Sequence, residues 1–428
     1  MSRKLSVLIL TEVGMKLADY VMDYLADYGV KQVFLVYGAA IGDFVDWFAH
    51  NDRMKYVSVM HEQAGAFAAE TYTKVSGKLG VAMATSGPGG TNLLTGIANC
   101  WYDSIPNLYI TGQILTQFLR KDPSIRQVGF QENDIVAMAE PITKFSGMVR
   151  NPQNIKRMLD FAIYSATHGR PGPVLLDIPL DIQRMEVDPD TLEGIEDFSD
   201  FKNVCANFKY SCRWTRYENP KWKIRSFLGH LDRAERPVLL VGGGVWLADA
   251  VDEVRELGRL LGIPCIPTWN AVDIFTDDYE YYRGRPGTYG GPGRNFAIQN
   301  ADLLLSIGSR IPGRMTGAVP TDFARGAMKY YVDVDKALLD PNLQEVPADV
   351  NIFCDAKTFT NALLDECKDR EIKTFDWWLD KTQEWLETYD TVLPEYYEVE
   401  DHVHPYVFIR ELSKLSLIHI SEPTRQAE

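Results

Sequence analysis

Glu62 is the first residue of this sequence whose type and position could serve chemistry. It follows the apolar segment KYVSVM and lies in the stretch HEQAGAFAAETY, whose small residues let a helix pack tightly against its neighbours. A carboxyl group at such a crowded, apolar helix start could exchange a proton with a bound molecule. The other interpretation is structural, because an acidic residue in the first turn of a helix complements the helix dipole.

Two further polar segments follow predicted strands. The strand LGVAMAT leads into TSGPGGTN, whose glycines permit a positive φ or the close approach of another molecule, and Thr91 or Asn92 is expected to cap the next helix. This loop lacks the G-K-[ST] of a Walker motif, and taken alone it could be an ordinary turn. The strand LYITG opens a long loop that ends at Gln131, and a lone buried glutamine is usually a satisfied polar group.

The elements that must position these residues alternate between strand and helix. From residue 15 to residue 185, apolar runs such as QVFLVYG, KYVSVM, LYITG and PVLLDIP alternate with helical patterns. This alternation predicts β-α-β crossovers and a parallel sheet buried on both faces. Open sheets of this kind bind ligands at the carboxyl ends of their strands, where Glu62 and residues 85–92 fall.

The remainder of the chain divides into further segments. Residues 186–222 are polar and aromatic and are interpreted as a linker. Residues 223–370 repeat the alternation with PVLLVGGG, GIPCIPTW, ADLLLSIGS and KYYVDVD, which predicts a second doubly wound α/β domain. Residues 371–414 are interpreted as a linker and the first helix of a lost domain.

Both ends of the chain break the pattern. Met15 begins the first amphipathic helix, MKLADYVMDYLADYGV, with Gly29 at its expected C-cap, so translation is expected to start there. At the other end LSLIHISEPTR resembles the translation of a transposase adaptor used in sequencing libraries. Residues 415–428 are therefore interpreted as an artefact, and a natural tail is the alternative.

Composition excludes several classes of protein. The 428 residues carry a formal charge of −15, which repels phosphate backbones and anionic lipid, so neither nucleic acid nor a membrane is an expected partner. No apolar run approaches the roughly 18 residues of a membrane span, and the N-terminus makes a poor signal peptide, so a cytoplasmic location is expected. The six cysteines form no C-x-x-C and the seven histidines no H-E-x-x-H, so no metal ligands are expected in this chain.

Taken in order, the motifs HEQAGAFAAETY, TSGPGGTN, DSIPNLYITGQ, FQE and RPGPVLLDIP resemble the pyrimidine-binding domain of thiamine-diphosphate-dependent enzymes of the acetolactate synthase group. RPVLLVGGG, FAIQNADLLLSIGSRIPGRMTG and VPADVNIFCDAK are similar to the central domain of the same group. The resemblance extends over residues 15–414. It implies two doubly wound parallel-sheet domains, pyrimidine-binding at 15–185 and central at 223–370, with the third domain of the group missing.

The resemblance also implies roles for particular residues. Glu62 matches the glutamate that shares a proton with the aminopyrimidine ring of thiamine diphosphate, in a dry pocket that raises the pKa of the acid. Gln131 matches a glutamine that contacts the reacting group, and Phe130 would wall the pocket. The other positions implied to line or approach the aminopyrimidine are Gly38, Thr85, Pro88 and Asn92.

Two positions depart from the group. Its aromatic-Pro-Gly-Gly turn is Val36-Tyr37-Gly38-Ala39-Ala40 here, so a flexible glycine is lost. Leu180 stands where the true synthases have a lysine, which removes a cation near the region that receives charged acids. These departures favour an acetolactate-synthase-like enzyme whose donor and acceptor remain open.

The cofactors implied are thiamine diphosphate and Mg²⁺, with the metal held in the third domain by a Gly-Asp-Gly motif and a later asparagine. This sequence contains no Gly-Asp-Gly, so the chain alone is expected to be inactive. Some members of the group hold FAD in the central domain and others leave that domain empty. Gly242-Gly243-Gly244 lacks the last glycine of G-x-G-x-x-G, while Arg310 lies where a phosphate-contacting arginine would, so both alternatives stay open.

The leading hypothesis is an enzyme that, when complete, decarboxylates pyruvate or a similar 2-oxo acid and joins the two-carbon unit to an acceptor carbonyl, as in branched-chain amino acid biosynthesis. A second hypothesis is a 2-oxo-acid decarboxylase or diketone hydrolase of the same superfamily. A third is a non-catalytic nucleotide-binding scaffold, which would not need a buried acid at position 62. In the group, domains of two subunits face each other, so a homodimer or homotetramer is expected.

Overall fold

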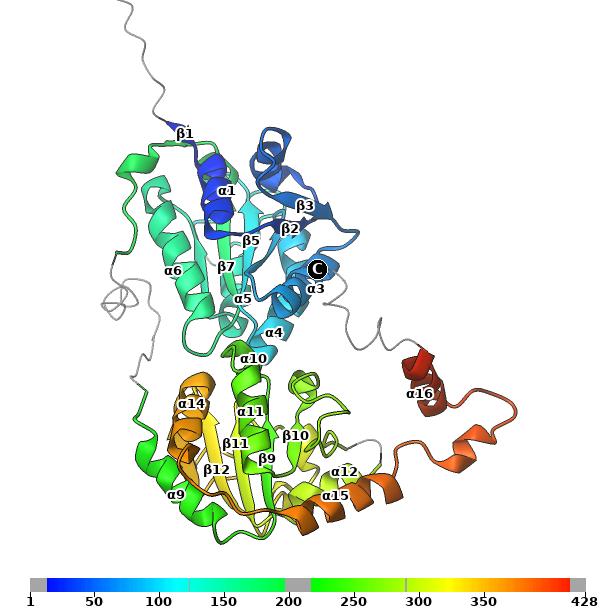
Figure 1. Ribbon diagram of the computed structural model, residues 1–428. Helices are drawn as coiled ribbons and strands as arrows, with labels where there is room; N and C mark the ends of the chain where they lie inside the picture. The colour runs from blue at the N-terminus through cyan, green and yellow to red at the C-terminus, as the bar shows by residue number, and fades with distance from the viewer. Residues whose placement is uncertain (1–13, 123, 197–216, 289–290, 416–428) are drawn as a thin grey trace, which may run out of the picture. The chain divides into compact units, whose positions relative to one another are not determined.

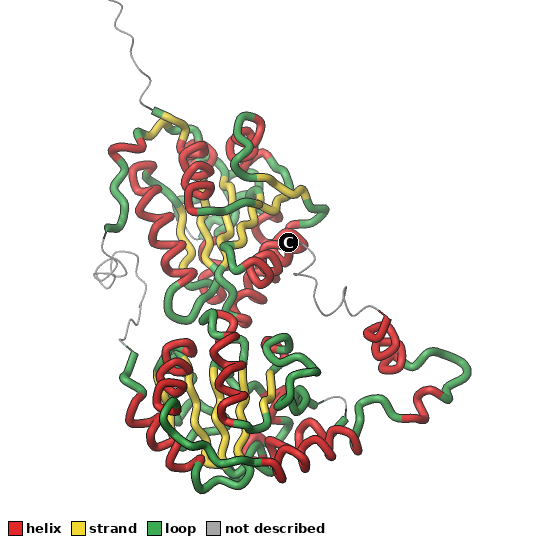
Figure 2. The backbone as a smooth tube through the Cα atoms, in the orientation of Figure 1, coloured by secondary structure: helices red, strands yellow, loops and turns green. Residues whose placement is uncertain are grey.

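The computed structural model of the chain describes residues 14–122, 124–196, 217–288 and 291–415. These residues form two compact units that divide near residue 214, and each unit is described by itself. In both units a parallel sheet is flanked by helices, as the ribbon in Figure 1 and the tube in Figure 2 show. The predicted fold class, α/β with two doubly wound parallel-sheet domains, is confirmed.

The first unit contains a six-stranded parallel sheet of order β3-β2-β4-β5-β7-β6. Its strands are β2 (Gln32–Leu35), β3 (Lys55–Ser58), β4 (Gly80–Ala84), β5 (Asn107–Gln113), β6 (Phe145–Met148) and β7 (Val174–Pro179). Its helices are α1 (Leu17–Tyr28), α2 (Gly42–Asp46), α3 (Glu62–Ser76), α4 (Pro88–Asp103), α5 (Ile135–Ala139), α6 (Ile155–Thr167) and α7 (Leu180–Gln183). Because the strands are parallel, all of them end at one edge, where ligands bind in such sheets.

The two faces of this sheet carry side chains of different size. One face presents large apolar residues such as Met83 and Ile110, which join α1 and α6 in a single hydrophobic cluster. The opposite face carries α3, and a Cβ on Gly80 in β4 would overlap the backbone of Ala69 in α3. The absence of a side chain at this position therefore lets α3, the helix that begins with Glu62, lie close to the sheet.

The first unit confirms one expectation from the sequence, the C-cap of α1, and contradicts another, the burial of β3. Gly29 has a φ of 103° at the end of α1, which confirms the predicted C-cap. β3, expected to be buried on both faces, is an edge strand whose four residues are all exposed, because the sheet covers it on one side only.

Residues 186–192, expected to begin the linker, pack on the first unit instead. β8 (Glu186–Val187) pairs antiparallel with β1 (Met15–Lys16), and the side chains of Val187 and Leu192 are buried. These two apolar residues inside an acidic stretch are the physical reason for the difference. Of the expected linker, residues 197–216 lie outside the described residues.

The second unit contains a five-stranded parallel sheet of order β10-β9-β11-β12-β13. Its strands are β9 (Pro237–Val241), β10 (Cys265–Pro267), β11 (Leu303–Ile307), β12 (Met328–Asp333) and β13 (Val350–Phe353). Its helices are α9 (Lys221–Leu231), α10 (Gly244–Leu247), α11 (Val251–Leu261), α12 (Gly293–Gln299), α13 (Gly313–Thr316), α14 (Ala356–Cys367), α15 (Asp376–Thr388) and α16 (Pro405–Leu415). One hydrophobic cluster joins the sheet to helices that include α9, α11, α14 and α15, and it contains the buried thiols of Cys265, Cys354 and Cys367.

Residues 371–414, expected to be a linker and the first helix of a lost domain, divide into two parts in the structure. Their first part packs on the second unit, because Phe375 and Trp378 are buried in its core and Trp378 Nε1 donates to the Pro237 carbonyl of β9 at 3.0 Å. The environment of their last part is open. Helix α16 contributes no buried residue, and Phe408 and Ile409 on it are more than half exposed. The tail interpreted as an artefact, from residue 416 onward, lies outside the described residues.

Candidate functional site

The candidate site lies where the strand order of the first sheet reverses. β2 pairs with β3 on one side and with β4 on the other, so the loops after β2 and β4 leave the sheet at the position where open α/β sheets bind ligands. Gly38 in the first loop faces Thr85 in the second, and a Cβ on Gly38 would overlap the Thr85 side chain. The Thr85 hydroxyl accepts a hydrogen bond from the Ala40 amide at 3.2 Å, which ties the two loops together.

Glu62 is the first residue of α3, and its carboxylate reaches the start of α4. Asn92 Nδ2 donates to Glu62 Oε2 at 2.9 Å. The second oxygen, Oε1, faces Gly89, where a Cβ would stand 3.4 Å away, so the glycine leaves room beside it. Glu62 is half-buried and lies next to the 85–92 turn. A carboxyl group with one oxygen held and the other accessible can exchange a proton or a hydrogen bond with a ligand.

The start of α4 differs from the sequence prediction. Gly87, with a φ of +65°, is the N-cap, and Pro88 takes the first helical position, where a missing amide hydrogen is tolerated. Thr91 and Asn92, expected to cap the helix, lie inside its first turns instead. The Asn92 side chain is consequently available to bind Glu62, which helix capping would have prevented.

Gln131 approaches the same turn in an uncommon backbone conformation. Its φ is +60°, and it faces Gly87, where a Cβ would stand 2.8 Å from the Gln131 Cβ. A non-glycine residue in this region costs on the order of 1 kcal/mol or more and persists only where its surroundings hold it. The Asn133 side chain, which donates to the Gly87 carbonyl at 2.9 Å, and the buried carboxylate of Glu132, which accepts two backbone amides of the loop, supply that support.

The predicted site residues therefore fall into two groups. Those that gather around the 85–92 turn are Gly38, Glu62, Thr85, Pro88, Asn92 and Gln131. Phe130, expected to wall the pocket, is 84% exposed within the described chain. Arg310 belongs to the second unit, where it is exposed after β11.

The contact between α3 and α4 holds Glu62 at the level of Asn92. One turn beyond the Glu62–Asn92 hydrogen bond, Gly96 lies against Ala66, and a Cβ on Gly96 would overlap the Ala66 Cβ. The glycine therefore lets the two helices approach as closely as backbones can. This contact sets the position of α3 along α4 and its rotation about its own axis, and thereby the position of the Glu62 carboxylate.

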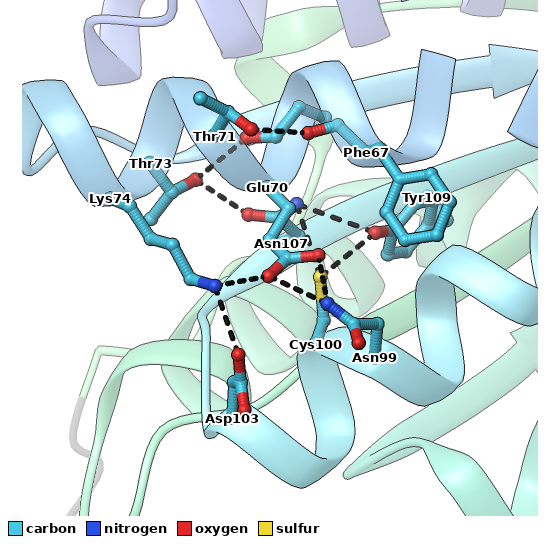
Figure 3. A network of polar contacts seen from close by, with 11 residues as sticks. Phe67, Glu70, Thr71, Thr73, Lys74, Asn99, Cys100, Asp103, Asn107 and Tyr109 are labelled. Atoms are coloured by element: carbon cyan, nitrogen blue, oxygen red, sulfur yellow. Dashed lines mark hydrogen bonds and ion pairs between the residues drawn. The ribbon is translucent and has the colours of Figure 1, made fainter. Parts of the chain in front are cut away.

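A polar network closes the far end of the same helix pair (Figure 3). Asn99 Nδ2 donates to both carboxylate oxygens of the buried Glu70, at 2.9 and 2.7 Å, and Lys74 pairs with Glu70 at 2.5 Å and with Asp103 at 2.9 Å. Burial opposes the charge on Lys74, but its hydrogen bonds to the two acids outweigh that effect and raise its pKa. Cys100 is buried beside the network, and burial raises the pKa of its thiol.

A buried carboxyl group that the sequence analysis did not single out lies beneath the site loops. Asp177 in β7 is fully buried, Thr111 Oγ1 donates to its Oδ1 at 2.8 Å and Gln113 Nε2 donates to its Oδ2 at 3.0 Å. Burial raises the pKa of Asp177 to about 7, although the two hydrogen bonds lower it. The sequence offers only the polar residues near the ends of two apolar strands, and the register that sets Asp177 opposite Thr111 is visible only in the structure.

The glycines after β9 lie at the corresponding position of the second unit. β9 pairs with both β10 and β11, so the strand order reverses there. A Cβ on Gly242 would overlap the Gly308 carbonyl after β11, and one on Gly244 would stand 2.8 Å from the Gly308 Cα. The packing of the chain against itself thus requires these glycines, and they give no independent support for a bound FAD.

Two kinds of feature are absent from the described residues. Within those ranges no three or more His, Cys, Asp and Glu side chains are grouped so that they could hold a metal ion. No helix among them combines the length and apolar character that crossing a bilayer requires.

Comparison with known proteins agrees with the fold. Residues 15–138 match the family described as thiamine pyrophosphate enzyme, N-terminal TPP binding domain, and residues 224–363 match the one described as thiamine pyrophosphate enzyme, central domain. The chain belongs to the thiamine pyrophosphate enzymes, of which it contains these two domains.

Within that family the chain is similar to acetolactate synthase large subunits. It is 32% identical over 402 residues to the acetolactate synthase large subunit of Cyanidium caldarium, an alignment that covers 92% of this chain and 65% of the relative. It is 36% identical over 385 residues to that of Corynebacterium glutamicum, with 89% and 57% covered, and 34% identical over 370 residues to the probable acetolactate synthase large subunit of Methanocaldococcus jannaschii, with 86% and 59% covered. The resemblance inferred from the motifs is confirmed, and the chain spans less than two thirds of the length of these relatives.

Proposed function

We propose that the first unit binds the aminopyrimidine ring of thiamine diphosphate and that Glu62 is the catalytic acid at that ring. The observation that carries the proposal is the Glu62 carboxylate, held by Asn92 beside the 85–92 turn where the strand order reverses. The residues fit a flat, nitrogen-rich ring, because Glu62 supplies a hydrogen-bonding oxygen beside the turn, while Gly38 and Gly89 let the backbone of both loops pack closely around the Thr85 side chain. When bound, thiamine diphosphate supplies an electron sink for the decarboxylation of 2-oxo acids.

Each residue of the site then has a defined task. Glu62 holds or gives a proton at Oε1, the oxygen that Asn92 does not engage, and Asn92 keeps the carboxyl group from rotating. Thr85 fixes the Gly38 loop through the Ala40 amide, so that backbone can approach the ring. Gln131, held in place by Gly87 and Asn133, contacts the substrate.

We further propose that the protein joins the two-carbon unit of a 2-oxo acid to an acceptor carbonyl, as the names of its relatives suggest. The diphosphate and Mg²⁺ are then bound by a third domain, on the same polypeptide or on a partner, since this sequence contains no Gly-Asp-Gly. Residues 1–428 alone are therefore expected to be inactive.

Decarboxylation or diketone hydrolysis without ligation is the second candidate, and Leu180 favours it. Leu180 begins α7 directly after β7 and brings an apolar side chain to the position where the synthases have a lysine. Product analysis with pyruvate, in a protein that includes a diphosphate-binding domain, separates the two candidates. Acetolactate supports ligation, and acetaldehyde supports decarboxylation alone.

The variant Glu62→Gln tests the proposal most directly. In a protein with a diphosphate-binding domain, we expect exchange of the cofactor's C2 proton to fall by about 10² or more, because a glutamine cannot exchange a proton with the ring. The change in C2 proton exchange is measured by NMR in deuterated water. Glu140→Gln, at an exposed glutamate that the proposal does not place in the site, is the matched control and should leave exchange unchanged.

The same variant can be examined in the chain as it stands. Titration with the aminopyrimidine half of thiamine should shift the side-chain amide resonance of Asn92, and Glu62→Gln should abolish that shift. Unaltered C2 exchange and unaltered pyrimidine binding in Glu62→Gln would contradict the proposal and favour a non-catalytic scaffold.

Assembly and FAD binding are the finer parts of the proposal. Met60, two residues before Glu62, is 100% exposed, and Phe130, directly before Gln131, is 84% exposed. Large apolar side chains beside a site favour cover by a second subunit. A homodimer or homotetramer should therefore form in solution, which sedimentation velocity measures. Visible flavin absorbance of the purified protein decides whether the second unit holds FAD, and Arg310→Ala should reduce any such absorbance.

A further inference from the structure

A series of hydrogen bonds connects the interior of the first sheet to the loop that carries Gln131. Gln113 Nε2 donates to Asp177 Oδ2 at 3.0 Å and also to the Asn133 carbonyl at 2.9 Å. Asn133 Nδ2 in turn donates to the Gly87 carbonyl at 2.9 Å. The series starts at a fully buried carboxyl group in β7, passes through the end of β5 and finishes at the N-cap of α4.

Asp177 is one of three groups that set which way the Gln113 amide points, together with the Ile114 amide and the Asn133 carbonyl. An ionised carboxylate only accepts hydrogen bonds, so Gln113 must turn its NH₂ group toward Asp177. Its second N–H then reaches the Asn133 carbonyl, while its Oε1 accepts the Ile114 amide at 3.0 Å. With a neutral side chain at position 177 that donates as well as accepts, only the Ile114 amide and the Asn133 carbonyl would still oppose the flipped Gln113 amide, an orientation that leaves no donor for the loop.

The loop needs such support because its backbone is strained. Gln131 and Gly87 both have positive φ and face each other across the turn. Asn133 bridges the two segments, since its carbonyl is held by Gln113 and its side chain holds Gly87. Releasing the Asn133 carbonyl therefore frees the segment that keeps Gln131 in its costly conformation.

We propose that Asp177 is a positioning residue that holds the Gln131 loop through Gln113 and Asn133. The proposal rests on the proposed function for its consequence, because that function places Gln131 at the substrate. The positioning itself concerns only contacts inside the first unit, so it can be measured without cofactor or substrate.

A stabilising role and a positioning role for Asp177 predict different effects of Asp177→Asn on the stability of the fold. The carboxyl group is bonded by two neutral donors, Thr111 and Gln113, and Asp134 and Arg150 are the charged groups that act on it. Ionising it in the interior is unfavourable, and an asparagine of the same shape would remove that penalty. If Asp177 were retained for stability alone, Asp177→Asn would weaken the fold and the loop together.

The test is hydrogen exchange of the Asp177→Asn variant of the full chain, followed by mass spectrometry, with thermal unfolding at about pH 8 alongside. We expect peptides that include residues 129–134 to exchange about fivefold faster, the equivalent of about one lost hydrogen bond, while the melting temperature stays equal or rises. Thr111→Val is the matched control, because it removes the other hydrogen bond to Asp177 and leaves Gln113 in place. It should lower the melting temperature without changing exchange in the loop.

Gln113→Leu provides a second variant that removes the donor itself. It should reproduce the faster loop exchange of Asp177→Asn, and combining the two changes should add nothing further, because both break the same contact. Unchanged loop exchange in both variants, or faster exchange throughout the unit together with a lower melting temperature, would overturn the proposal. If the loop loosens as expected while Glu62→Gln leaves pyrimidine binding intact, the positioning stands and the proposed function fails.

Discussion

Asp177 couples the stability of the first unit to pH. Burial raises its pKa to about 7 from an ordinary value of 3.8, so the folded protein binds this proton more tightly than the unfolded chain does. The corresponding stability is fully present below the unfolded pKa and is lost as the pH rises through the folded pKa near 7. A shift of this size amounts to about 4 kcal/mol, as an order of magnitude.

Asp177→Asn removes this titration and should therefore gain stability relative to the parent as the pH rises. The difference in the free energy of unfolding should grow between about pH 4 and pH 7 and become constant above about pH 8. Urea denaturation at several pH values measures it. Asp134 raises the pKa of Asp177 and Arg150 lowers it. Replacing Asp134 should therefore lower the pH at which the stability difference is half complete, and replacing Arg150 should raise that pH. A difference that does not vary with pH would contradict the assignment.

Those site residues that lie in recognisable sequence motifs could be predicted. Glu62, the 85–92 turn and Gln131 come from short segments that resemble a known family, and the structure places them around one turn. The partner of Asn92 was not predictable, because the sequence suggests helix capping and the structure shows a helix that begins at Pro88. Asp177, Gln113 and Asn133 were missed because a buried polar contact depends on strand register, which an apolar run such as VLLDIP does not reveal.

At the scale of elements, the α3–α4 contact is the feature that most directly sets the site. Gly96→Ala should destabilise the first unit by about 1 to 3 kcal/mol, because its Cβ would overlap Ala66 and force the helices apart. Chemical denaturation measures the loss, and the Glu62–Asn92 contact should be weakened in the same variant.

Gly229→Ala is the matched control for that prediction. Gly229 also lies inside a helix, α9, but a Cβ there would meet nothing within 4 Å. The change should stabilise the protein by about 0.5 to 1 kcal/mol, since alanine favours helix and restricts the unfolded chain. Equal effects at the two glycines would show that the α3–α4 approach is not tight.

Periodicity predicts the types of the elements and their order along the chain, but it does not predict which strands pair with each other. The alternation of apolar runs with helical patterns predicts the strands and crossovers of both sheets, and these are confirmed. Periodicity carries no information on strand order, so the exposed edge position of β3 could not be foreseen. The pairing of β8 with β1 joins segments at opposite ends of the first unit, which local patterns cannot indicate.

At the scale of the whole molecule, each unit has a core of its own. The hydrophobic cluster of the first unit and that of the second draw on separate sets of residues. Residues 14–196 and residues 217–415, produced separately, should therefore each unfold cooperatively, and their circular dichroism spectra should sum to that of the intact chain. A unit that is unstructured by itself would show that its stability depends on the other.

The buried cysteines allow local unfolding of each unit to be followed by chemical labelling. Cys100 in the first unit and Cys265, Cys354 and Cys367 in the second are covered, and burial raises the pKa of each thiol, so none should react with a disulfide reagent while its surroundings stay closed. With Cys205 and Cys212 replaced by serine, the labelling rate of each remaining sulfur records how often its neighbourhood becomes accessible. Each unit therefore contains at least one buried thiol whose labelling rate, measured as an increase in mass under native conditions, reports local opening of that unit.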